Sequence, residues 1–108
     1  MTDVLRGRLR HVRSAPPTGE RTETIVRARN LVVEQVLSGA IEPRGYLQPE
    51  DEWALVLEGA ATLDVEGEAV ELRSGDWVFL PSGTPHRLVR TEPGTNWLTV
   101  KLGPDDRP

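Results

Sequence analysis

The chain has 108 residues, a formal net charge of −4 and no cysteine, and it is 37% hydrophobic and 28% charged. This balance predicts one soluble globular domain and excludes disulfides, thiolate metal sites and a cysteine nucleophile. The acidic net charge argues against nucleic acid as a partner, because phosphate contacts need a basic surface. The longest apolar runs, WALVL and WVFL, are too short to span a membrane. The N-terminal segment MTDVLRGRLRHVR lacks an apolar signal sequence, which favours the cytoplasm.

An N-terminal arm with a proline-rich linker is expected over residues 1–21. Its arginines, Arg6, Arg8, Arg10 and Arg13, mostly recur at every second position. That spacing fits the solvent face of an edge strand. The segment SAPPTG is expected to be a loop or stiff linker, because its prolines disfavour helix and sheet. The main domain is then expected over residues 22–102, followed by a polar tail over residues 103–108.

Short strands are expected throughout the main domain, because apolar residues alternate or form short runs between closely spaced turn residues. In Glu66-Gly67 we expect a tight hairpin turn, with Gly67 supplying the positive φ that such turns need. Seven or eight strands with turns this frequent predict a β-sandwich or a small barrel. The expected strand segments are TETIVRAR, NLVVEQVLSGA, WALVLEG, the two halves of ATLDVEGEAVEL, DWVFLPSG, HRLVRTEPG and NWLTVKL.

The segment GDWVFLPSGTPH carries the most specific motif in the chain. It has a glycine, five residues, a proline, one residue, a glycine, two residues and a histidine, at Gly75, Pro81, Gly83 and His86. This spacing resembles the second sequence motif of the cupin family. The later asparagine of that motif would fall at Arg90, so this position departs from the pattern.

The segment GYLQPEDEWALVLEG resembles the first cupin motif with an altered site. Gly59 closes the motif, and Glu52 stands where the family has its glutamate. The two histidines that usually precede this glutamate would fall at Tyr46 and Gln48. The resemblance implies an all-β fold, the double-stranded β-helix or cupin jelly-roll barrel. The resemblance also implies a homodimer, since cupins commonly form dimers, and the apolar, strand-forming N-terminal half agrees with this expectation.

A metal site is one hypothesis for the barrel cavity, around which strand alternation is expected to place Tyr46, Gln48, Glu52 and His86. The cupin resemblance implies iron, manganese, nickel or zinc, held by three imidazoles and a carboxylate. The chain has only two histidines, His11 and His86, so three imidazoles are impossible within one chain. His11 lies in the arm, where a solvated side chain is expected. A weaker site for one divalent metal, with Gln48, Glu52 and His86 as ligands, stays open.

Acid–base catalysis is a second hypothesis for the same residues. Glu52 and His86 can share a proton near neutral pH, while Tyr46 and Gln48 donate hydrogen bonds to a carbonyl or enolate oxygen. This set suits isomerisation, epimerisation or elimination beside a carbonyl group. The four side chains can equally satisfy one another in a non-catalytic module that binds a small carboxylate or carbonyl compound. Whether the chain is an enzyme is therefore left open.

Three tryptophans, Trp53, Trp77 and Trp97, each lie in an apolar strand segment. Core or dimer packing explains them better than stacking on a ligand. Because Trp53 is adjacent to Glu52, it is expected to point away from the cavity.

Overall fold

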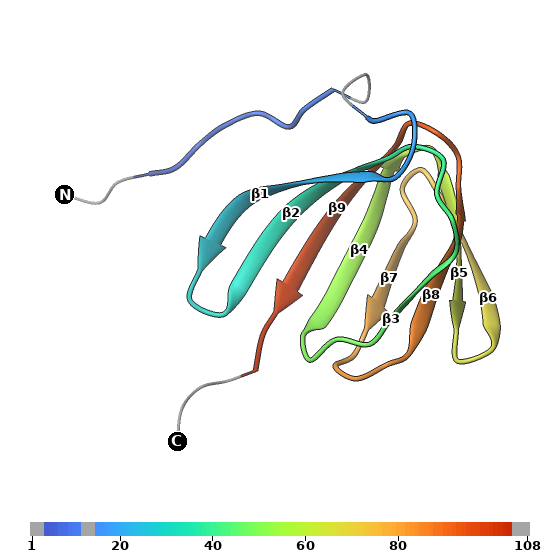
Figure 1. The fold of residues 1–108 in the computed structure, drawn as a ribbon. Coiled ribbons are helices and arrows are strands. Elements are labelled where there is room, and N and C mark those ends of the chain that lie inside the picture. The colour runs from blue at the N-terminus through green and yellow to red at the C-terminus, as the bar shows by residue number, and fades with distance from the viewer. Residues whose placement is uncertain (1–3, 12–14, 105–108) are drawn as a thin grey trace.

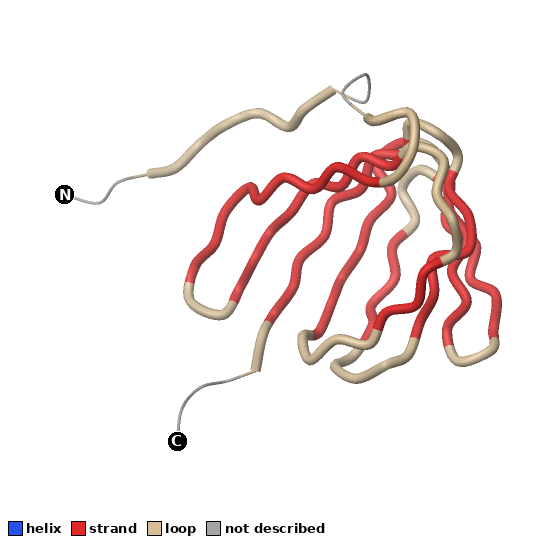
Figure 2. Tube along the Cα trace, in the orientation of Figure 1, coloured by secondary structure: helices blue, strands red, loops and turns tan. Residues whose placement is uncertain are grey.

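The computed structural model describes residues 4–11 and 15–104 of the chain, and no helix occurs among them (Figure 2). No helix in these residues is therefore long and apolar enough to cross a membrane. The strands are β1 (Glu20–Ala28), β2 (Leu31–Ser38), β3 (Arg44–Tyr46), β4 (Asp51–Glu58), β5 (Ala60–Val65), β6 (Glu68–Arg73), β7 (Trp77–Leu80), β8 (His86–Thr91) and β9 (Thr95–Leu102).

The strands form two sheets that face each other (Figure 1). The larger sheet has the order β1-β2-β9-β4-β7, and the smaller one has the order β3-β8-β5-β6. Every pairing between these strands is antiparallel. The predicted all-β class is confirmed. The short strand β3 was not predicted, since three residues between Pro43 and Pro49 are too few to show an alternating pattern.

The core fills the space between the two sheets. Alternate residues of the central strands face inward, so that Ala54 and Val56 of β4 lie on the same side as Trp97 of β9. Leu63 of β5 and Leu88 of β8 meet them from the smaller sheet. All five side chains are at most 5% exposed. This burial of apolar surface is the main force holding the sheets together.

The hairpin between β5 and β6 follows the prediction. Glu66 and Gly67 have φ values of 52° and 90°, so both turn residues adopt the left-handed region. The backbone N–H of Gly67 also donates a 2.8 Å hydrogen bond to Oδ1 of Asp64. Two positive φ angles are what a two-residue turn needs to match the strand twist.

Gly59, which joins β4 to β5, has a packing reason to be glycine. Its φ is 98°, and a Cβ atom there would lie 2.8 Å from the Cα of Thr95. A larger residue would therefore push the two chain segments apart. The glycine that closes the first motif is thus required by the turn that connects the two sheets.

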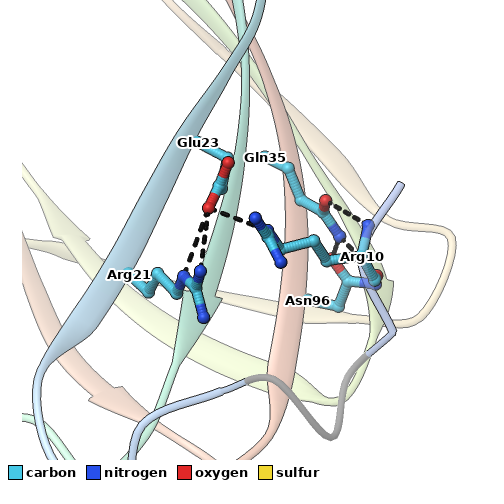
Figure 3. Close-up of polar contacts among 5 residues, drawn as sticks. All are labelled: Arg10, Arg21, Glu23, Gln35 and Asn96. Atoms are coloured by element: carbon cyan, nitrogen blue, oxygen red, sulfur yellow. Dashed lines mark hydrogen bonds and ion pairs between the residues drawn. The ribbon is translucent and has the colours of Figure 1, made fainter. Parts of the chain in front are cut away.

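The N-terminal arm, residues 4–11, is not a strand, so the edge-strand prediction is wrong for these residues. Its attachment is a side chain on the outer face of the larger sheet (Figure 3). Gln35 accepts a 2.8 Å hydrogen bond from the backbone N–H of Arg10 and donates one of 2.9 Å to its carbonyl oxygen. Arg10 also pairs with Glu23 at 2.8 Å. The buried side-chain amide of Gln35 thus holds the arm in place of the backbone hydrogen bonds that an edge strand would make. Arg13 lies outside the described residues.

Candidate functional site

A cavity of about 290 Å³ opens between the two sheets. Its walls include apolar side chains from both sheets, among them Ala54, Leu63, Leu80 and Leu88. All four of the predicted site residues also line it: Tyr46, Gln48, Glu52 and His86. A concave site that combines apolar walls with convergent polar groups is typical of a small-molecule pocket.

Tyr46 and His86 stand side by side on the smaller sheet. Tyr46 is the last residue of β3 and is paired in register with His86, the first residue of β8. Their rings stack with centroids 5.4 Å apart and an angle of 23° between the planes. The pairing of two strand ends therefore orients both rings toward the cavity.

One hydrogen bond of the His86 ring indicates which ring nitrogen remains available to a ligand. Its Nδ1 lies 3.0 Å from the carbonyl oxygen of Thr84. Because a carbonyl oxygen can only accept, Nδ1 carries the hydrogen. Within the described residues Nε2 has no hydrogen-bond partner, although the side chain is only 7% exposed. In the neutral ring, Nε2 is therefore a proton acceptor available to a ligand.

Glu52 comes from the opposite sheet. It is the second residue of β4, where alternation places it on the same face as the buried Ala54. Gln48, in the loop between β3 and β4, donates a 2.6 Å hydrogen bond from Nε2 to Oε1 of Glu52. The other carboxylate oxygen has no partner among the described side chains. Gln48 thus orients Glu52 in the cavity.

Tyr46 is held as a neutral phenol. Burial raises the pKa of Tyr46 above its ordinary value of 10.0, and the negative charges of Glu20 and Glu52 raise it further. Arg44 and Lys101 act in the opposite direction with smaller effect than burial. A phenol that keeps its proton is a hydrogen-bond donor rather than an anionic metal ligand.

Sequence reasoning missed five further polar residues of the cavity wall: Glu20, Thr22, Glu34, Thr99 and Lys101. Lys101 pairs with Glu34 at 3.3 Å. The pairing register of the strands would have identified them. For example, Lys101 of β9 is paired with Glu52 of β4, which places both side chains on the cavity face of the sheet. Register between distant strands cannot be read from one sequence, whereas alternation within one strand can.

The tryptophans divide between the two faces of the larger sheet. Trp53 does not line the cavity, and its ring lies 6.4 Å from that of Trp77. Trp97 is 3% exposed and lines the cavity as well as the core, so the expectation of packing alone was incomplete for it. Its Nε1 donates a 3.1 Å hydrogen bond to Oγ of Ser38.

The donor set does not fit the metal centre that the cupin resemblance implies. Among the described residues, no three histidine, cysteine, aspartate or glutamate side chains gather closely enough to hold a metal ion. His11 does not line the cavity, so the only imidazole there is that of His86. The amide N–H of Gln48 is directed at Glu52. A weaker site at Gln48, Glu52 and His86 therefore stays a prediction.

Comparisons with known proteins agree with this architecture. A structure from Ralstonia eutropha JMP134, provisionally described as a mannose-6-phosphate isomerase, is 25% identical, covers 91% of this chain and 100% of its own, and has a TM-score of 0.71. KdgF from Halomonas sp. is 22% identical over 82% of this chain and 83% of its own, with a TM-score of 0.69. An RmlC-like cupin from Shewanella frigidimarina NCIMB 400 is 17% identical over 82% of this chain and 79% of its own, with a TM-score of 0.71.

These structures confirm the jelly-roll fold that the two motifs implied. No curated protein sequence matches the chain. A family model described as a cupin domain matches residues 32–100, which include both motif segments and the strands β3 to β8. The chain therefore belongs to the cupin family.

Proposed function

We propose that this cupin binds a small molecule in the cavity and catalyses proton transfer beside a carbonyl group. The observation that carries the proposal is the environment of His86. Its Nδ1 is engaged by the carbonyl oxygen of Thr84, which leaves Nε2 as a proton acceptor on a buried ring at the cavity wall. A base with a fixed tautomer, reachable only through a pocket, is what general base catalysis needs.

The chemistry would divide among three side chains. Nε2 of His86 takes a proton from the carbon beside the carbonyl, and the C–H electrons form the enolate double bond. The neutral phenol of Tyr46 donates a hydrogen bond to the enolate oxygen as its charge develops. Glu52 takes the proton of a neighbouring hydroxyl group and returns it to the former carbonyl oxygen. His86 then delivers its proton to the former carbonyl carbon, and the electrons of the neighbouring oxygen form the new carbonyl group as the carbon–carbon double bond is lost, which completes an isomerisation.

The test is deuterium incorporation at the carbon beside the carbonyl. Small aldoses and ketoses are incubated with the protein in D₂O and followed by NMR. We expect exchange with the wild-type protein and a loss of at least about 100-fold in Glu52→Gln and His86→Gln, the scale of lost acid–base catalysis. Glu68→Gln, at an exposed residue of β6, is the matched control. Equal exchange rates in Glu52→Gln and the wild type would refute the role of Glu52.

The second candidate is a binding module without catalysis. Two contacts favour it: the hydrogen bond between Gln48 and Glu52 and the stacking of the Tyr46 ring on the His86 ring. Each pair of side chains is stabilised by its own contact without a reaction to perform. The two candidates differ at Glu52→Gln, which keeps the shape of the side chain and removes its charge. A binding module would change only its affinity.

We further propose that the chain is a homodimer in the cytoplasm, with a small molecule as its partner. The outer face of the larger sheet supports the dimer. Trp77 and Phe79 are 60% and 50% exposed there, and Val4 and Leu5 of the arm are 83% and 78% exposed. Exposed apolar surface of this kind marks protein–protein contacts. The net charge of −4 supports a small molecule over nucleic acid.

A further inference from the structure

We propose that the ligand of this cavity is a small organic cation, a molecule with a protonated amine. The inference concerns the same cavity and therefore rests on its proposed function as a small-molecule site. It goes beyond that function by naming the charge of the ligand. Two features support it: carboxylates that have no cationic partner among the described residues, and the Nε2 atom of the buried His86 ring, for which those residues supply no hydrogen-bond partner.

The cavity wall holds more negative than positive charge. Its carboxylates are Glu20, Glu34 and Glu52, and its ammonium group is that of Lys101. Lys101 already pairs with Glu34 at 3.3 Å, with both side chains largely shielded from solvent. Among the described residues, no ion pair includes Glu20 or Glu52. Two carboxylates therefore face the cavity without a positive partner.

Neutral donors hold both of these carboxylates in place. Oε2 of Glu20 accepts a 2.7 Å hydrogen bond from Oγ of Ser38, which in turn accepts one of 3.1 Å from Nε1 of Trp97. Oε1 of Glu52 accepts from Gln48 at 2.6 Å. In each carboxylate one oxygen is oriented by the protein and the other is left for a ligand. Carboxylates fixed in this way favour a ligand whose positive charge lies near their free oxygens.

The aromatic walls suit the same ligand. Tyr46 and Trp97 both line the cavity, and the face of an aromatic ring attracts an ammonium group. The field of the carboxylates is also felt at Tyr46, because the charges of Glu20 and Glu52 raise its pKa beyond the effect of burial. An anion would meet this field offset only by Lys101, which is already paired with Glu34, and by Arg44, which does not line the cavity. A small carboxylate, one of the ligand classes expected from the sequence, is therefore disfavoured.

An organic cation fits the spacing better than a metal ion does. No three acidic or imidazole groups of the described chain come close enough together to ligate one metal. An amine, in contrast, can meet one carboxylate with its N–H groups while the rest of the molecule reaches other walls. His86 supplies the second contact, since Nε2 is without a partner on a side chain that is 7% exposed. A hydroxyl or N–H group of the ligand can donate to it.

The experiment compares ligands that differ only in charge. Primary amines, alcohols and carboxylates on the same carbon skeletons are titrated into the full chain, and the indole N–H signal of Trp97 and the ring signals of His86 are followed by NMR. We expect at least one amine to shift these signals and to bind about tenfold or more tightly than its alcohol and carboxylate counterparts, a difference of about 1.4 kcal/mol. An alcohol or carboxylate that binds as tightly would overturn the inference. The absence of any amine binding up to about 10 mM, weaker than the millimolar range, would also overturn it.

Charge-removing variants locate the effect in the cavity. Glu20→Gln keeps an oxygen that can accept from Ser38, and Glu52→Gln keeps the shape of the side chain. Each is expected to weaken amine binding about tenfold at low salt and to leave alcohol binding within about twofold. Glu68→Gln, an equal charge change at an exposed residue of β6, is expected to leave the binding of both amines and alcohols unchanged. If it weakens amine binding as much as Glu20→Gln, net charge explains the effect and the inference fails.

This experiment separates the inference from the proposed catalysis. Amine binding is read from NMR shifts and needs no turnover. Amine binding without deuterium exchange in any carbonyl compound would support the ligand class and refute the enzyme. Exchange in neutral or anionic substrates, with no amine bound, would support the enzyme and refute the ligand class.

Discussion

The side-chain amide of Gln48 donates a 2.6 Å hydrogen bond to Oε1 of Glu52. Gln48 stands where the first cupin motif commonly has a histidine, so the position that would ligate a metal instead orients a carboxylate. Glu52 is then free to use its other oxygen toward a ligand or a proton. The two residues act as one unit, and the first prediction concerns them.

Replacing Gln48 by Leu should lower turnover more than it lowers stability. The lost hydrogen bond is worth about 1 kcal/mol, so the unfolding midpoint in urea should shift only slightly. In contrast, an unfixed carboxylate should slow deuterium exchange about tenfold or more, because catalysis depends on its position. Gln48→Glu, which cannot donate from an ionised side chain, should lose as much. A Gln48→Leu variant with wild-type exchange would show that Glu52 needs no such support.

Tyr46 offers a direct test of the cavity's electrostatics, because it is the only tyrosine in the chain. Burial and the charge of Glu20 raise its pKa above 10.0 in the folded protein. The tyrosinate absorbance should therefore appear at higher pH in the folded protein than in urea, where the ordinary value returns. Equal midpoints in the two states would contradict the buried, negatively charged surroundings of the phenol.

The raised pKa of Tyr46 also sets the direction of a stability change with pH. Since the folded state holds the proton more tightly than the unfolded state, the contribution of the neutral phenol is fully present below about pH 10. It is lost as the pH rises through the folded-state pKa. Tyr46→Phe has no such group, so its stability should fall less steeply in this range, measured by denaturant unfolding at each pH. An equal slope in both proteins would show that other groups dominate.

The parts of the fold that were predictable are those set by local pattern. The Glu66-Gly67 turn follows from the positive φ it requires, and the inward position of Glu52 follows from alternation along β4. The attachment of the arm was not predictable in this way. It depends on Gln35, which is 1% exposed and holds the backbone of Arg10 from 25 residues away. A contact this distant leaves no periodic signal in the chain.

The candidate site likewise contains residues that local sequence motifs predict and residues that only the strand pairing reveals. Tyr46, Gln48, Glu52 and His86 were found because two motif segments carry them. Glu20 was missed, because its place in the cavity depends on β1 pairing with β2, where Glu20 stands opposite Ser38. The charge balance of the cavity, and hence the class of ligand, becomes visible only when the strand register is known.

Metal content gives the fourth test. With one imidazole in the cavity, the purified, untagged protein should contain clearly less than one equivalent of iron, manganese, nickel or zinc by elemental mass spectrometry. Restoring the family's two histidines in the double variant Tyr46→His, Gln48→His should raise the content toward one equivalent. His86→Ala in that background should remove it again. Near-stoichiometric metal in the wild type, lost in His86→Ala, would instead establish a metal site with fewer histidines.

The outer face of the larger sheet gives the last prediction. Because Glu52 and Ala54 face the cavity, Trp53 between them faces outward, and its register partner Phe79 shares that face. Trp77 lies beside Trp53, with ring centroids 6.4 Å apart, and is 60% exposed. An aromatic surface of this kind is costly to leave in water and is typical of the centre of an interface.

Trp77→Glu should therefore convert a dimer into a monomer, measured by light scattering at micromolar concentration, because the new charge would be buried without a partner. Val89→Glu is the matched control: Val89 is 37% exposed on β8 of the smaller sheet, so the same change there should leave the dimer intact. A wild-type protein that is already monomeric would refute the dimer. A Val89→Glu variant that dissociates while Trp77→Glu does not would move the interface to the smaller sheet.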